Sequence, residues 1–330
     1  MNAYRCRQQG VALVAVLMII AIVVVIAVNM TGRLQLQLQR QQNVQQQQQA
    51  FWYAMGAEQF AKVLLSRTLA GEESVNLAQD WALQGATFPV ENGTIAGDIK
   101  DLHSCFNINA LQNVSAQNGN RNEQSPAQKA FLRLLELKGS ELSMPAEYLV
   151  ARLGDWLDED SLLSTAGSAE DDDYAALQFP YYTANGLMAS VSELRVILDM
   201  TPADYQLLAP YVCVIPENSG LVLNVNTLTE DTAVLLAALI PELTEQGAAD
   251  VIAGRPEEGF ANIEEVFGSE ALAGITVPDE VKTMLSVKSD TFQLTATAAY
   301  LESGFILTSV LKLDENNQVK VLARRFGGQG

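Results

Sequence analysis

The chain has 330 residues, 48% of them apolar, and carries 39 acidic against 20 basic residues, for a net charge of −19. This length and apolar content suit two or three folded domains and exclude a disordered chain. The acidity repels phosphate backbones, so we expect no nucleic acid among its partners.

An uncharged apolar run covers residues 11–30, after a short segment that contains Arg5 and Arg7. About 20 such residues cross a hydrocarbon core of roughly 30 Å as a helix. A secretory signal peptide would need a small-residue cleavage site after the run, but residues 27–29 make a poor one and the helical pattern continues. We therefore predict a retained transmembrane helix.

We predict that this helix continues to Ala70, because residues 31–70 lack proline and are rich in helix formers up to Gly71. The glutamine-rich part could instead be a low-complexity linker. Apolar residues at helical spacing follow it, and we expect them to pack on a globular domain. They are Phe51, Trp52, Met55, Phe60, Val63 and Leu64.

Alternation of apolar and polar residues predicts four strands at 94–102, 291–299, 305–313 and 318–326. The sequence Asp-Glu-Asn-Asn at 314–317 favours a hairpin turn between the last two. These strands come from both ends of the chain and suggest one antiparallel sheet with the long helix on it. The fold class is therefore α+β.

Residues 107–286 separate the two parts of this sheet and read as helical throughout, so we expect an inserted helical domain. The hexapeptide at 106–111 recurs in related form at 223–228, which suggests that the two halves share ancestry. Residues 190–212 and 247–268 have the rhythm of helix-hairpin-helix modules. The acidic surroundings favour a structural or protein-binding role over DNA binding.

Eight acidic residues and no basic one lie between positions 155 and 173. Calcium takes six to eight oxygen ligands from irregular loops and is the natural counter-charge. A solvated acidic loop is the alternative, and the spacing is not that of an EF-hand. We predict calcium ligands at Asp158, Asp160, Glu170 and Asp171, with Asp155, Asp172 and Asp173 as reserve candidates.

The three cysteines, Cys6, Cys105 and Cys213, show no paired metal-type spacing, so we expect no zinc site. A membrane at residues 11–30 would separate Cys6 from the other two. Cys105 and Cys213 could then form a disulfide in an oxidising periplasm, and two separately buried thiols are the alternative. We expect the disulfide.

Catalytic motifs are missing from the sequence. The sole histidine, His103, lies beside a predicted strand end, and Ser-His, P-loop and zinc-hydrolase motifs do not occur. The crowded acids lack the aromatic spacing of a glycosidase site. We predict no enzymatic activity.

The N-terminus resembles that of type IV pilin-like proteins, because Arg-Gln-Gln-Gly at 7–10 is followed directly by the apolar run. This resemblance implies that a prepilin peptidase cleaves between Gly10 and Val11 and that the new amino group is methylated. Most pseudopilins carry glutamate at the fifth mature position, where this chain has Ala15. Its absence is typical of the K-type subunit of the type II secretion system.

The insertion also resembles the K-type family, in the segments 154–174, 180–195, 223–243 and 255–260. The resemblance implies a minor pseudopilin at the pseudopilus tip, with a helical domain inserted into a pilin-like fold. It further implies that calcium binds that domain, and that the partners are the I-type and J-type minor pseudopilins and other pseudopilus subunits.

The expected organisation is a leader (1–10), a transmembrane helix half (11–30), a pilin-like domain (31–106 and 287–330) and an inserted helical domain (107–286). We expect a single-pass inner-membrane protein with its globular domains in the periplasm, supporting protein export across the outer membrane. The alternatives are a calcium-dependent membrane-anchored periplasmic binding module and a membrane-tethered hydrolase.

Overall fold

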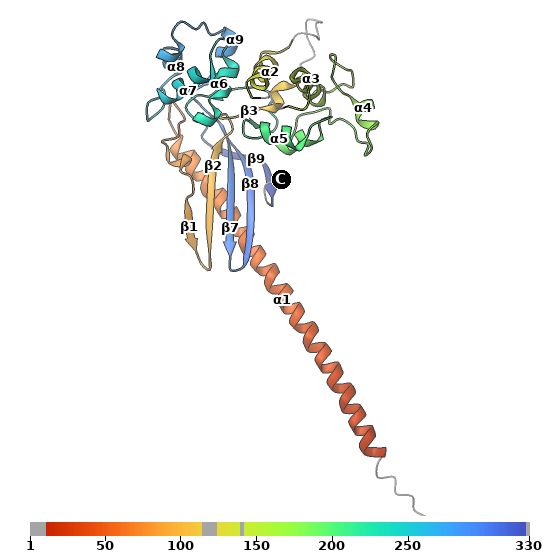
Figure 1. Ribbon diagram of the computed structural model, residues 1–330. Coiled ribbons are helices and arrows are strands. Elements are labelled where there is room, and N and C mark those ends of the chain that lie inside the picture. Colours follow the sequence, from red (N-terminus) through yellow and green to blue (C-terminus); the bar gives the residue numbers. More distant parts are fainter. Residues whose placement is uncertain (1–10, 114–123, 139–141, 328–330) are drawn as a thin grey trace, which may run out of the picture.

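The computed structural model describes residues 11–113, 124–138 and 142–327. Gly10 and the rest of the expected leader lie outside the described residues. The chain forms a long helix, an antiparallel sheet against its C-terminal part, and a helical region at one end of the sheet (Figure 1). This arrangement confirms the predicted α+β, pilin-like class.

Helix α1 runs from Val11 to Thr68 without a break, and the glutamine-rich stretch is part of it. Its 58 residues correspond to roughly 87 Å at the standard helical rise. The apolar N-terminal window is fully exposed and extends away from the rest of the molecule (Figure 1). Among the described residues, α1 is the one helix long and apolar enough to cross a membrane.

The predicted packing face of α1 is confirmed in part. Met55 and Leu64 pack against the core between the helix and the sheet, and the ring of Phe51 contacts those of Phe305 and Phe326, but the other three predicted residues are exposed. Trp52, Phe60 and Val63 are 64%, 56% and 48% exposed. Small residues let the helix approach the sheet closely, which leaves large side chains at the rim. The buried positions, spaced three to four residues apart, are Ala50, Ala54, Glu58, Ala61 and Leu65.

Glu58 is the one charged residue on this buried face, and its side chain is completely enclosed. Arg324 donates to both of its carboxylate oxygens, from Nε at 2.7 Å and from Nη2 at 2.8 Å. Ser309 Oγ donates a third hydrogen bond at 2.7 Å. This two-pronged ion pair joins α1 to the sheet with fixed geometry.

The sheet has five antiparallel strands in the order β1-β2-β7-β8-β9. The four predicted strands appear within two residues of their expected bounds, and residues 314–317 form the turn between the last two. The sequence reading missed β1, a four-residue edge strand that contains Pro89. The strands are β1 (Thr87–Val90), β2 (Gly93–Asp101), β7 (Thr291–Tyr300), β8 (Ser303–Leu313) and β9 (Val319–Phe326).

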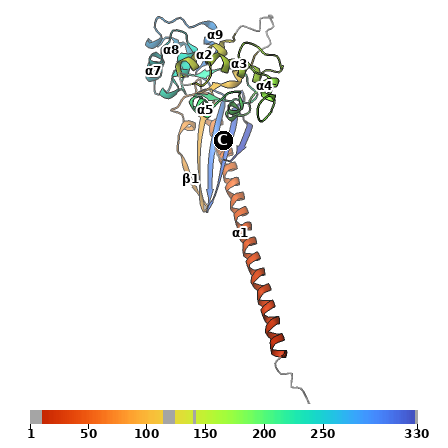
Figure 2. The same ribbon diagram turned by 45° about the vertical axis from the view of Figure 1, so that its right-hand side comes forward.

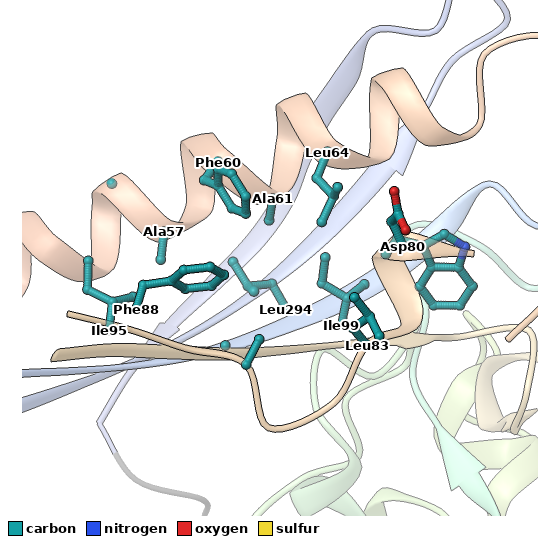
Figure 3. Close-up of a pocket in the computed structure, with 14 residues that line it drawn as sticks. Ala57, Phe60, Ala61, Leu64, Asp80, Leu83, Phe88, Ile95, Ile99 and Leu294 are labelled. Atoms are coloured by element: carbon teal, nitrogen blue, oxygen red, sulfur yellow. The ribbon is translucent and has the colours of Figure 1, made fainter. Parts of the chain in front are cut away.

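An apolar groove of about 340 Å³ lies between α1 and the β1 edge of the sheet. In Figure 3, Phe60 and Leu64 from the helix face Phe88, Ile99 and other apolar residues on the opposite wall. The rings of Phe60 and Phe88 contact each other, with centroids 5.7 Å apart. Among the large side chains of α1, those of Phe60 and Leu64 therefore line this groove.

The inserted region gathers at the end of the sheet remote from the free half of α1 (Figure 2). Helices predominate, with two short parallel strand pairs, β3–β4 and β5–β6, that the sequence reading did not foresee. Its first half contains β3 (Phe106–Asn107), η2 (Ile108–Leu111), α2 (Pro126–Lys138), α3 (Ala146–Leu157), α4 (Asp171–Ala175), η3 (Val191–Val196), α5 (Pro202–Leu208) and β4 (Val212–Cys213). Its second half contains β5 (Leu223–Asn224), η4 (Glu230–Thr232), α6 (Val234–Leu239), α7 (Glu245–Ala253), α8 (Ile263–Phe267), η5 (Glu270–Leu272), α9 (Asp279–Lys282) and β6 (Leu285–Ser286).

The two halves contain equivalent asparagine side-chain to backbone hydrogen bonds. Asn109 accepts from the backbone N–H of Met188 at 2.9 Å and donates to its carbonyl at 3.1 Å. Asn226 makes the same pair of bonds to Phe260, at 2.8 and 2.9 Å. Each asparagine belongs to one copy of the repeated hexapeptide, so the sequence echo has a structural equivalent.

Candidate functional site

Three buried carboxylates meet in the first half of the inserted region. Each of Asp155, Asp158 and Glu170 has an oxygen within 4.8 Å of those of the other two. Their exposed fractions are 0%, 7% and 3%. Buried acids this close require a counter-charge or protonation.

The local fold explains how distant acids converge. Asp155 occupies the last turn of α3, and Asp158 is the residue that ends this helix. Glu170 precedes the first residue of α4, and its backbone N–H donates to Asp173 Oδ2 at 3.0 Å. The C-terminal end of α3 carries partial negative charge, which adds to the need for a cation.

Basic side chains do not neutralise the cluster. Arg152, one turn before Asp155, instead donates to the carbonyls of Gly167 and Leu198 and to the carboxylate of Asp199. Within the described part of the chain, no ion pair joins a basic residue to any of the three acids.

The hydrogen-bond donors that reach these carboxylates are neutral groups, including the backbone N–H groups of Ser164 and Asp160. Asn113 Nδ2 donates to Asp155 Oδ1 at 3.0 Å and to Asp158 Oδ2 at 3.1 Å. Thr183 Oγ1 donates to Glu170 Oε2 at 3.4 Å. Glu170 Oε1 is buried without a hydrogen-bond partner among the described residues. A buried carboxylate oxygen without a donor is available to accept a bond from a cation.

The electrostatics of the cluster follow from burial. Desolvation, together with the charges of Asp155 and Asp158, raises the pKa of Glu170 to about 7. Desolvation and the charges of Asp155 and Asp160 raise the pKa of Asp158 to about 6. Burial also raises the pKa of Asp155. All three acids resist ionisation in each other's presence, so a divalent cation would relieve the repulsion.

The structure brings together Asp158 and Glu170 from the four primary candidates, and Asp155 from the reserve. Asp160 follows in the same loop, and its Oδ1 accepts from the N–H of Leu162. Asp171 accepts from the Thr183 hydroxyl at 2.6 Å and from the Thr183 N–H at 3.1 Å. The bond from the hydroxyl lowers the pKa of Asp171. The other two reserve candidates, Asp172 and Asp173, are exposed.

The sequence reading missed the residues that support the cluster. Asn113 lies 42 residues before Asp155, and Gln128 Nε2 donates to its Oδ1 at 2.8 Å. Asn185, between α4 and η3, also has a buried Oδ1 without a hydrogen-bond partner among the described residues. An asparagine in a polar stretch gives no sequence signal for such a role.

The donor set fits calcium. Calcium prefers hard oxygen ligands and accepts irregular loops, and three converging carboxylates with an orphaned oxygen meet that preference. Within the described residues the cluster contains neither the thiolates nor the imidazoles that zinc favours.

The predicted disulfide between Cys105 and Cys213 is confirmed. Their Cα atoms are 5.7 Å apart, and the bond closes a loop between residues separated by 108 positions. Both side chains are buried next to the paired strands β3 and β4. A bond of this kind persists in an oxidising compartment.

The remaining predicted feature is the start of α1. Val11 is the first described residue, and Ala15 lies on the exposed first turns of the helix. Among the described residues, none packs against this end of α1. A neighbour or a membrane is needed to cover its apolar surface.

A long helix on an antiparallel sheet, with a helical domain inserted between strands, defines a pilin-like subunit of the enlarged type. The family described as type II secretion system (T2SS), protein K, matches residues 104–217 and 223–288. The type II secretion system protein K of Pectobacterium carotovorum subsp. carotovorum is 37% identical across 98% of both chains. That of Klebsiella pneumoniae is 38% identical across 97% of both.

Among solved structures, the chain resembles one in the crystal structure of the GspK-GspI-GspJ complex from the type 2 secretion system of enterotoxigenic Escherichia coli. The TM-score is 0.75 at 30% identity, over 88% of this chain and 100% of that one. The chain therefore belongs to the type II secretion system protein K family. The resemblance seen in its sequence is confirmed.

Proposed function

We propose that this protein is a minor pseudopilin at the tip of the type II secretion pseudopilus, where it assembles with I-type and J-type pseudopilins and supports protein export. Its similarity to a chain of the GspK-GspI-GspJ complex supports these partners. The role is structural rather than enzymatic. Ala15 is the observation that carries the position at the tip.

Ala15 bears on the position in the filament through electrostatics. In pilin-like filaments the glutamate at the fifth mature position meets the N-terminal amine of the neighbouring subunit inside the apolar helix bundle. A carboxylate in hydrocarbon is costly and persists where a partner charge compensates it. A subunit with no neighbour ahead has no amine to neutralise, and alanine avoids an unpaired charge.

The placement of the inserted region points the same way. It covers the end of the sheet remote from the free half of α1 (Figure 1). A subunit stacked beyond that end would collide with it, whereas a subunit that follows behind would not. The leading end of the filament has room for this shape.

Two glutamate substitutions in the apolar half of α1 test this position. We expect Ala15→Glu to reduce secretion, and crosslinking to the I-type and J-type pseudopilins, as strongly as the matched control Ala21→Glu. If Ala15→Glu is tolerated while Ala21→Glu is not, a neighbour ahead supplies an amine and the tip position is wrong. Crosslinking along the whole filament, in stoichiometric amounts with the major pseudopilin, would also contradict it.

The proposal includes processing and an inner-membrane anchor. Cleavage after Gly10 would make methylated Val11 the first residue and place the globular parts in the periplasm. It would remove Arg5 and Arg7 and change the net charge from −19 to −21. Intact-mass measurement of membrane-extracted protein decides this, and an uncleaved chain from cells with active prepilin peptidase would contradict it.

We also propose that the inserted region binds calcium. Asp155, Asp158 and Glu170 would hold it, and Asp160, after the end of α3, and Asp171, at the start of α4, are further candidate ligands. The orphaned Glu170 Oε1 and the raised pKa values of Asp158 and Glu170 support this assignment. Elemental analysis of protein purified without chelator should find calcium. Metal-free protein whose unfolding temperature is the same with calcium and with chelator would refute it.

A further inference from the structure

The inserted region is joined to the sheet through a buried polar junction. The chain leaves β2 at Asp101, enters the insertion at β3, and returns through Asp290 to β7. His103 lies on the outgoing connection with 8% of its surface exposed. It is the only histidine of the chain.

Both ring nitrogens of His103 face hydrogen-bond acceptors. Nδ1 lies 3.1 Å from the carbonyl oxygen of Val222, in the inserted region. Nε2 lies 3.1 Å from Oδ1 of Asp290, at the start of β7. A neutral imidazole has one N–H, so one nitrogen would turn a lone pair toward an oxygen. The doubly protonated ring alone donates to both.

The charges around the ring are mostly acidic. Asp101 Oδ1 accepts from the backbone N–H of His103 at 2.8 Å, and its other oxygen accepts from the hydroxyls of Thr227 and Ser289. Lys312 of β8 lies 3.7 Å from the second oxygen of Asp290. Lys100 of β2 adjoins Asp101, and no charged residue of β5 faces the ring. Asp290 stays ionised because its bond to His103, among others, lowers its pKa to about 2.

We propose that His103 is a pH-sensitive clamp whose imidazolium form fastens the inserted region to the sheet. Below the pKa of the ring, one cation bridges the carbonyl of Val222 and the carboxylate of Asp290. Above it, one of the two bonds is lost and the connection loosens. The orientation of the inserted region on the sheet is thus coupled to proton concentration outside the cytoplasm.

The direction of the pH effect follows from the opposing influences on the pKa of His103. Burial lowers the pKa of His103, but its bonds and charge interactions with Asp290 and Asp101 outweigh burial and raise the pKa above its ordinary value. A raised histidine pKa gives stability that is fully present below about 6.5, the unfolded value. That stability disappears as the pH rises through the folded-state pKa.

Nuclear magnetic resonance of the full chain in detergent measures the pKa of the His103 ring directly. With ¹³C-labelled histidine and no histidine tag, the single imidazole signal belongs to His103. We expect its titration midpoint above about 6.5. Asp290→Asn should lower the midpoint, whereas the control Asp279→Asn, an exposed surface acid, should leave it unchanged. A wild-type midpoint at or below 6.5 overturns the proposal.

Amide hydrogen exchange tests whether the ring holds the junction. Protection of residues 101–104 and 222–227, corrected for intrinsic exchange, should fall above the measured pKa, by at most about tenfold per pH unit for one proton. In His103→Gln this pH dependence should vanish. Protection that does not vary with pH in the wild type, or that varies equally in His103→Gln, would contradict the clamp.

Discussion

Two sets of buried carboxylates in the molecule have different partners. In the pilin-like part, Glu58 is enclosed and receives two bonds from Arg324 and one from Ser309. In the inserted region, Asp155, Asp158 and Glu170 are also buried, but the groups that donate to them, among them the side chains of Asn113 and Thr183, are neutral. The first site is complete within the chain, and the second lacks positive charge.

This difference separates an acid whose charge the chain neutralises from acids whose charges it does not. A buried ion pair with all its bonds made fixes geometry, here the position of α1 on the sheet. A cluster of acids without a cation raises its own pKa values and stores repulsion that a metal would release. Burial alone would not distinguish the two sites, whereas the partners do.

The largest expected effect comes from breaking the complete site. Arg324→Met should leave Glu58 buried and unpaired and destabilise the pilin-like part by about 3–5 kcal/mol. Thermal unfolding of the full chain in detergent measures it. Arg325→Met, which removes the neighbouring exposed arginine, is the control. A change no larger in Arg324→Met than in this control would show that the ion pair does not hold α1.

Neutralising one acid of the cluster of Asp155, Asp158 and Glu170 should have the opposite effect on stability. In chelator, Asp158→Asn and Glu170→Gln should leave the unfolding temperature unchanged or raise it, because each removes repulsion. Calcium at a hundred times its Kd should stabilise the wild type by about 2.7 kcal/mol and these variants much less. Marked destabilisation of both variants in chelator would mean that the acids are structural, as Glu58 is.

Lowering the pH should reduce the stabilisation that calcium provides. The pKa values of Asp158 and Glu170, about 6 and about 7, lie above those of unfolded chains. An acid with a raised folded-state pKa favours the folded state when protonated, so the chelated protein should gain stability as pH falls from 7.5 to 5. Calcium must displace those protons, so its stabilisation should shrink over the same range. Unfolding temperatures with and without calcium at both pH values test this, and an increment that grows on acidification contradicts it.

The smallest expected effect concerns Asn113. Asn113→Ala removes the donor that orients Asp155 and Asp158, and such supporting contacts typically contribute about tenfold or more to metal affinity. Calcium titration followed by unfolding temperature gives the change. Asn316→Ala, in the exposed β8–β9 turn, is the control. Equal affinities in the two variants would show that Asn113 does not support the site.

Alternation of apolar and polar residues predicted the four strands, whereas the apolar run, the helix formers and the absence of proline predicted the long helix. The sequence patterns failed at β1, which has four residues, and on part of the packing face of α1, where alanines and Leu65 rather than Trp52 or Val63 are buried. The acidic segment was found because its charges are consecutive. Which acids converge depends on where α3 ends and α4 begins, and composition does not reveal this.

Partners from distant segments could not be predicted. Arg324 lies 266 residues from Glu58, and Asn113 comes from outside the acidic segment altogether. A single acid among apolar residues of α1 was a usable signal that Glu58 is buried with a partner. His103 gave no comparable sign, because its two acceptors come from parts of the chain 119 and 187 residues away.

Terbium luminescence tests the central claim, that the three buried acids form a calcium site, most directly. Trp156 adjoins Asp155 and packs on Tyr174 of α4, with ring centroids 5.3 Å apart, so it can sensitise a lanthanide bound between α3 and α4. We predict tryptophan-excited terbium emission from the full chain that calcium suppresses and that Glu170→Gln abolishes. Emission that is absent from the wild type, or that neither calcium nor Glu170→Gln reduces, would contradict the account.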